Sequence, residues 1–68
     1  MPNPAEGIIS IHGNNMQRII LLSMLGNILE EKRCNQSCEF DLSTKPAGIY
    51  YIKVITNDRV FIRKIVRI

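Results

Sequence analysis

The chain consists of short segments in which apolar and polar positions alternate, separated by residues typical of turns. In GIISIHG, residues 7–13, Ile9 and Ile11 share one side, while Ser10 and His12 share the other. Alternation with a period of two is the pattern of a β-strand that buries one face. We therefore expect a short strand between the two glycines.

Residues 16–32 fit either a helix or strands. Ile20, Met24 and Ile28 recur at helical spacing, but the apolar residues between them also suit a strand that is buried on both faces. The dipeptide Gly26-Asn27 in the middle is a strong turn signal, and a glycine inside a helix costs about 1 kcal/mol. The segment is therefore predicted to form strand, turn and strand.

The second half of the chain continues this pattern of strands and turns. CEFDLS at 38–43 reads as a strand, 43–48 as a loop and GIYYIKVIT at 48–56 as a longer strand. Asn57-Asp58 then turns the chain into the strand of RVFIRKIVRI, which gives a C-terminal hairpin. Short strands at regular spacing predict an all-β fold, a small antiparallel β-sandwich.

Length and composition limit the chain to one small domain. Its 68 residues are 46% hydrophobic and 6% aromatic, which is too apolar for a disordered tail. The longest uncharged apolar stretch, 19–29, has 11 residues, whereas a spanning helix needs about 20. No transmembrane segment is expected, and the residues after Met1 do not form a secretory signal, so any export signal would have to lie upstream.

The net charge of +3 lies at the C-terminal end. Residues 53–68 carry five basic side chains against Asp58 alone, whereas residues 1–52 carry one more acidic than basic side chain. A basic end suits nucleic acid, an anionic surface or an acidic partner. Protection of a strand edge against aggregation is the preferred interpretation. Nucleic acid is disfavoured because no aromatic residues alternate with the basic ones in an RNA-binding pattern.

The sequence contains no arrangement typical of an enzyme. His12 is the only histidine, and the adjacent Glu30 and Glu31 would point to opposite faces of a strand, so they cannot share a proton. The serines lack a G-x-S-x-G context, and there is no glycine-rich phosphate loop. We therefore expect no catalytic residues, no metal site and no cofactor.

Cys34 and Cys38 are the only cysteines. On one strand, residues four apart lie roughly 13 Å apart, beyond the about 4.4–6.8 Å between the Cα atoms of a disulfide. Across a three-residue hairpin loop the two could face each other. Both a disulfide and two free thiols remain open; free thiols are preferred because closing so short a loop stabilises little.

Four segments in this order resemble one known family. They are PNPAEG, with Pro2, Asn3 and Pro4; LLSMLGNIL, with the turn at Gly26; FDLSTKPAGIYYIKV, with Pro46, Gly48 and Tyr50; and the closing RKIVRI. Over essentially the whole chain they resemble the type A C-terminal sorting domain of the type IX secretion system of Bacteroidota. Pro46 to Tyr50 is the most specific part of the resemblance.

The resemblance implies an immunoglobulin-like sandwich at the C-terminus of a cargo protein. Cargo of this family crosses the inner membrane by a separate N-terminal signal and reaches an outer-membrane translocon from the periplasm. A surface peptidase then removes the domain, cutting upstream of residue 1, and the cargo is released or linked to lipopolysaccharide at the cell surface. The implied partners are therefore the translocon, the peptidase and an N-terminal cargo domain.

Two regions are candidates for recognition. Lys64, Val66, Arg67 and Ile68 in the last strand could contact a partner's strand edge or acidic groove. In the turn, Pro46 pre-sets φ, and Gly48 supplies a positive φ or a close backbone approach. Tyr50 is expected in the core, with its hydroxyl bonded to a loop carbonyl.

The chain departs from the family pattern in two places. Before Gly26, Ser23 and Leu22 replace a common aspartate and tyrosine, so a weaker serine bond is expected in that turn. Family members also have a strand upstream of Pro-Asn-Pro, where this chain has Met1, so a first strand is expected to be missing and one sheet edge unpaired.

The alternative function is an immunoglobulin- or fibronectin-like binding module that serves a secreted enzyme. It would need exposed aromatic side chains, for which the candidates are Phe40, Tyr51 and Phe61.

Overall fold

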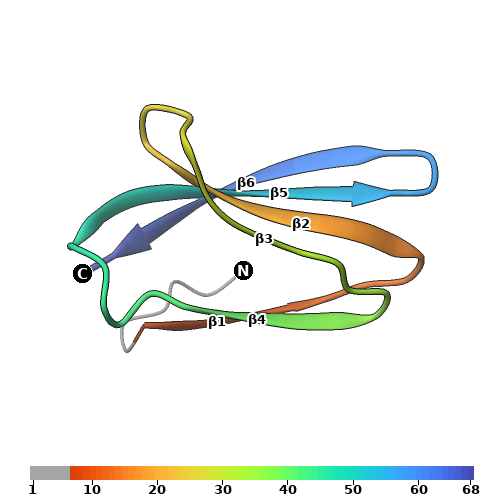
Figure 1. The fold of residues 1–68 in the computed structure, drawn as a ribbon, viewed down its shortest axis with the longest axis horizontal. Coiled ribbons are helices and arrows are strands. Elements are labelled where there is room, and N and C mark those ends of the chain that lie inside the picture. Colours follow the sequence, from red (N-terminus) through yellow and green to blue (C-terminus); the bar gives the residue numbers. More distant parts are fainter. Residues whose placement is uncertain (1–6) are drawn as a thin grey trace.

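The computed structural model of the chain describes residues 7–68, which form strands connected by turns (Figure 1). The strands are β1 (Ile8–His12), β2 (Met16–Ser23), β3 (Ile28–Lys32), β4 (Ser37–Asp41), β5 (Gly48–Thr56) and β6 (Val60–Arg67). The described part contains no helix, which confirms the all-β prediction. β4 ends two residues earlier than expected because Asp41 accepts a bond from the Ser43 N–H at 2.8 Å, which starts the turn.

The strands form two antiparallel sheets. β1 pairs with β4, and the second sheet has the order β3-β2-β5-β6. Figure 1 shows β1 and β4 as a layer beneath the four-stranded sheet. The chain crosses between the layers at β1–β2, β3–β4 and β4–β5, which makes the domain the small β-sandwich that the sequence predicted.

The core lies between the two sheets. Ile9 and Ile11 of β1 are buried, as their alternation with Ser10 and His12 predicted. The largest fully buried side chains come from both layers and from the connection after β4: Ile19, Leu21, Phe40, Leu42, Ile52 and Ile65. The core is therefore closed mainly by branched aliphatic side chains around a single phenylalanine.

The β2–β3 connection confirms the predicted strand, turn and strand. Gly26 has φ of 92°, a conformation that glycine adopts without steric cost, and its N–H donates to the Ser23 carbonyl at 2.9 Å. The Ser23 side chain accepts from the Asn27 N–H at 3.1 Å, which is the serine bond expected in place of an aspartate bond.

A disulfide joins Cys34 and Cys38, with Cα atoms 5.8 Å apart. The expectation of two free thiols is therefore corrected. Cys34 lies in the crossover from β3 to β4 and Cys38 lies in β4 itself, so the bond spans a connection between the sheets rather than a hairpin within one sheet. Cys38 is buried and Cys34 packs against the core, so the bond fixes one connection between the layers.

Two backbone carbonyls between the cysteines also bond the β1–β2 connection. Gln36 accepts from the Gly13 N–H at 2.9 Å, and Asn35 accepts from the Met16 N–H at 3.0 Å. The β1–β2 and β3–β4 connections are thus bonded to each other next to the disulfide.

Candidate recognition surface

The Pro46–Tyr50 turn is held from within the core. Tyr50 is 7% exposed, and its hydroxyl donates to the Pro46 carbonyl at 2.5 Å. Gly48 has φ of 147°, and a Cβ at that position would meet no atom within 4 Å. The backbone conformation, rather than a close approach, therefore explains the glycine. Tyr50 shapes the loop through the fold, as expected.

Arg67 holds the same loop from the end of β6. Its Nε donates to the Lys45 carbonyl at 3.0 Å, and its Nη2 donates to the Ser43 carbonyl at 3.2 Å. Of the tail candidates, Arg67 thus has a structural task, which sequence reasoning missed because its partners lie more than 20 residues away. The guanidinium of Arg67 is therefore bonded to the loop and is not a free charge at the surface.

The other tail candidates are arranged differently. Lys64 is exposed and lies opposite Tyr51 in the β5–β6 register, while Val66 is half-buried opposite Ile49. Ile68 follows the end of β6 and is 82% exposed. Within residues 7–68, β6 pairs only with β5, so it is an edge strand.

Asp41 and Ser43 form the start of the loop that Arg67 holds. The pKa of Asp41 lies below its ordinary value, first because the Ser43 side chain bonds the carboxylate and next because the Ser43 N–H does. The positive charges of Lys45 and Arg67 act in the same direction. The loop therefore contains a carboxylate that is stabilised in its ionised form.

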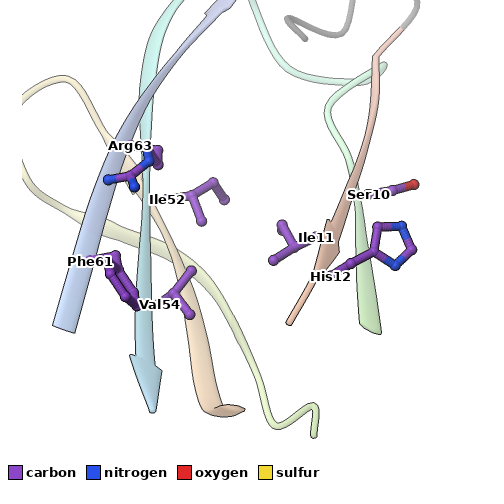
Figure 2. A pocket seen from close by; sticks show the side chains of 7 residues that line it. All are labelled: Ser10, Ile11, His12, Ile52, Val54, Phe61 and Arg63. Atoms are coloured by element: carbon purple, nitrogen blue, oxygen red, sulfur yellow. The ribbon is translucent and has the colours of Figure 1, made fainter. Parts of the chain in front are cut away.

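A cleft of about 340 Å³ opens between β1 and the β5–β6 hairpin. Figure 2 shows Ile11 on one side and Ile52, Val54 and Phe61 on the other, with Arg63 beside them. The Arg63 guanidinium lies 5.6 Å from the centre of the Phe61 ring. Within residues 7–68, β1 has only β4 as a partner.

Residues 7–68 contain no group of three side chains that could hold a metal ion. Glu30 pairs with Lys32 at 3.7 Å and Glu31 with Arg18 at 3.1 Å, so the adjacent carboxylates point to different partners. His12 is exposed. These described residues also form no helix that is long and apolar enough to cross a membrane.

The aromatic platform needed by a binding module is missing from the described surface. Phe40 is fully buried, and Tyr51 and Phe61 are only half-buried on different faces of the hairpin. The sequence had offered Phe40 as an exposed candidate, and its burial removes it. The alternative function thus loses one of its three side chains.

Pro2, Asn3 and Pro4 lie outside the described residues. Of the sequence-predicted positions, the structure brings Pro46, Tyr50 and Arg67 together around one loop. Gly26 lies on the β2–β3 hairpin, whose tip lines a shallow hollow with Ala47 and Gly48. Cys34 lies in the β3–β4 crossover and Cys38 near the start of β4, away from this loop.

Comparison with protein families gives a match to the model described as "Secretion system C-terminal sorting domain", over residues 1–68. Comparisons with curated proteins and with solved structures gave no significant match. The match covers the whole chain, and the all-β sandwich and the Pro46–Tyr50 turn agree with the resemblance seen in the sequence. The chain therefore belongs to the family of C-terminal sorting domains of the type IX secretion system.

Proposed function

We propose that this domain directs a cargo protein, joined to its N-terminus, across the outer membrane through the type IX translocon. The observation that carries the proposal is the family match over the whole chain. A sorting-signal family is not catalytic, so we propose no enzymatic role for the domain.

The proposal includes the route and the fate of the cargo. The cargo enters the periplasm by a separate N-terminal signal, and the folded domain is then recognised at the outer membrane. A surface peptidase cuts upstream of residue 1, and the cargo is released or linked to surface lipopolysaccharide. The domain itself is thus a transient address and does not remain with the mature cargo.

Recognition is proposed to use the C-terminal strand. β6 is an edge of the four-stranded sheet, and its exposed Lys64 and the protruding Ile68 are accessible to a partner. An edge strand offers main-chain bonds to an added strand, and basic side chains favour an acidic partner. Arg67 contributes indirectly, because it holds the loop that contains Pro46.

The test is a reporter with a secretory signal at its N-terminus, produced in a host with type IX machinery. Its C-terminus carries residues 1–68, preceded by a first strand and a cut site of the family. We expect the reporter outside the outer membrane, shortened by the mass of the domain. Removal of Lys64 to Ile68 should leave it in the periplasm at full length. The same fusion in a host without the translocon is the control, and export there would refute the proposal.

A further inference from the structure

The four-stranded sheet has an outward face that the described part of the chain leaves uncovered. In the β5–β6 register Tyr50 lies opposite Ile65, and both are buried in the core. Because neighbouring side chains on a strand point to opposite faces, the next pair, Tyr51 and Lys64, points away from the core. Leu22 of β2 lies opposite Tyr51 and extends this row across a third strand.

A second row runs beside the first. Lys53 lies opposite Ile62 on β6 and opposite Ile20 on β2. Ile62 is 56% exposed, which is high for an isoleucine inside a regular strand. We call five residues of these rows the outer patch: Leu22, Tyr51, Lys53, Ile62 and Lys64.

The outer patch has no covering layer within residues 7–68. β1 and β4 both lie on the opposite side of the sheet (Figure 1). A β-sandwich strand normally alternates an apolar inward with a polar outward side chain. On β5 and β6 the outward positions are instead a mixture of apolar and basic groups, which is the composition of a surface that meets a partner.

The charges of this face indicate the kind of partner. Lys53 and Lys64 form no ion pair with any residue between 7 and 68. The acidic side chain on the same face, Glu31, is paired with Arg18 at 3.1 Å. A surface that fits the outer patch therefore has an apolar centre with carboxylates placed opposite the two lysines.

We propose that the outer patch docks a partner protein whose contact surface is apolar at its centre and acidic around it. This inference rests on the proposed function, in which that partner is a component of the export machinery. The patch extends the recognition site from the tail to β5 and β2. It also divides the tail candidates: Lys64 lies within the patch, whereas Arg67 is bonded to the loop.

Charge argues against the other two occupants. A second copy of the chain would set Lys53 and Lys64 against the same lysines, with their repulsion uncompensated because Glu31 is already paired. An anionic lipid surface would attract the lysines but would also have to accommodate the Arg18–Glu31 pair on the same face. Three of the five side chains of the patch, Leu22, Tyr51 and Lys53, are also half-buried and would insert little into a bilayer.

The experiment uses the reporter fusion described above. Lys53→Glu combined with Lys64→Glu reverses the two charges of the patch. Lys53→Gln combined with Lys64→Gln removes the two charges without adding negative ones. Arg33→Glu with Arg59→Glu is the matched control, because both arginines are exposed, lie outside the patch and form no side-chain hydrogen bond or ion pair within residues 7–68. Ile62→Gln tests the apolar part, with the exposed Leu25→Gln as its control.

We expect the Lys53/Lys64 reversal to lower export at least tenfold, with a protease-resistant domain accumulating in the periplasm. The Lys53→Gln/Lys64→Gln variant and Ile62→Gln should each lower export by less. The two control variants should be exported as well as the unaltered fusion. Normal export of the reversed variant, or an equal loss in the control, would overturn the proposal.

Two further measurements identify the occupant. If the unaltered fusion self-associates in sedimentation and the reversed variant does not, the occupant is a second copy and the proposal is wrong. If vesicles of anionic phospholipid bind the unaltered fusion and release the reversed one, the occupant is lipid, which also overturns it. Failure of the unaltered fusion to leave the periplasm would instead refute the proposed function itself, and this inference with it.

Discussion

The hydroxyl of Tyr50 donates to the backbone carbonyl of Pro46 at 2.5 Å, so a core side chain holds a loop carbonyl four residues upstream. The tyrosine ring is buried between the sheets, while the loop lies at the surface. The conformation of the loop is thus coupled to the packing of the core. A change at Tyr50 should therefore alter stability and loop order together.

Removing that hydroxyl tests the coupling. Tyr50→Phe keeps the ring but leaves the Pro46 carbonyl without this donor, which should cost about 1 kcal/mol of unfolding free energy. Tyr51→Phe is the matched control, because the Tyr51 hydroxyl has no hydrogen bond within residues 7–68. Urea unfolding of both variants measures the difference. Equal midpoints for the two would show that the bond contributes nothing.

Gly48 provides a test of backbone conformation alone. Its φ of 147° is a region that residues with a Cβ rarely adopt, although nothing lies within 4 Å of a Cβ there. Gly48→Val should therefore destabilise the domain by 1 kcal/mol or more, on the order of the cost of such strain. Ala47→Val, next to it in the loop, should have a much smaller effect in the same denaturation experiment. A Gly48→Val variant as stable as its parent would contradict this account of the turn.

Local pattern was enough to predict the strands and turns of this chain. Alternation placed Ile9 and Ile11 in the core, and Gly26 decided between a helix and two strands. Both are properties of neighbouring residues, which a sequence displays directly.

What the sequence did not reveal depends on contacts between distant residues. The disulfide depends on a crossover between the sheets that brings Cys34 close to Cys38 of β4, and Arg67 reaches the carbonyl of Lys45, 22 positions away. The outer patch likewise can be recognised only from the β2–β5–β6 register, because that register brings Leu22 beside Tyr51. The local pattern does not show that β2 and β5, which are distant in the sequence, are neighbours in the sheet.

The disulfide should stabilise both crossovers at its end of the sandwich. For a loop of this length, chain entropy gives about 2 kcal/mol, which is more than the sequence-based expectation allowed and a large share for so small a core. A reductant should therefore lower the urea midpoint and speed hydrogen exchange at the N–H groups of Gly13 and Met16, which donate into the enclosed loop.

A variant with both cysteines replaced by alanine is the control for the reductant. It should resemble the reduced protein, and its midpoint should not respond to the reductant. If the unaltered domain is equally insensitive, the bond has no part in stability.

Acid should weaken the loop that begins at Asp41. The pKa of Asp41 is lower in the folded protein than in the unfolded chain, so as the pH falls the unfolded chain binds the proton first. The contribution of the ionised Asp41 to folding stability is therefore complete above about pH 4 and is lost as the pH falls through the pKa that Asp41 has in the folded protein. Urea midpoints measured between about pH 6 and about pH 2.5 should fall less steeply in Asp41→Asn than in the parent. Asp58→Asn, in the β5–β6 turn, is the control, and an equal effect of both substitutions would refute the role of the Ser43 bonds.

Arg67 and Lys64 should separate folding from recognition. Arg67→Ala removes the donor of two loop carbonyls at 3.0 and 3.2 Å, and hydrogen bonds to a charged group suggest a cost of about 1–2 kcal/mol at this partly exposed site. Lys64→Ala removes an exposed side chain and should change stability by less than about 0.5 kcal/mol. Urea unfolding of the two variants, set beside the export of the corresponding fusions, gives the comparison.

We expect Arg67→Ala to lower stability and export together, because the loop with Pro46 loses its attachment to β6. Lys64→Ala should lower export while stability stays at the level of the parent. A stable Arg67→Ala variant with impaired export would instead make Arg67 a direct contact of the partner, and a destabilised Lys64→Ala variant would place Lys64 in the fold.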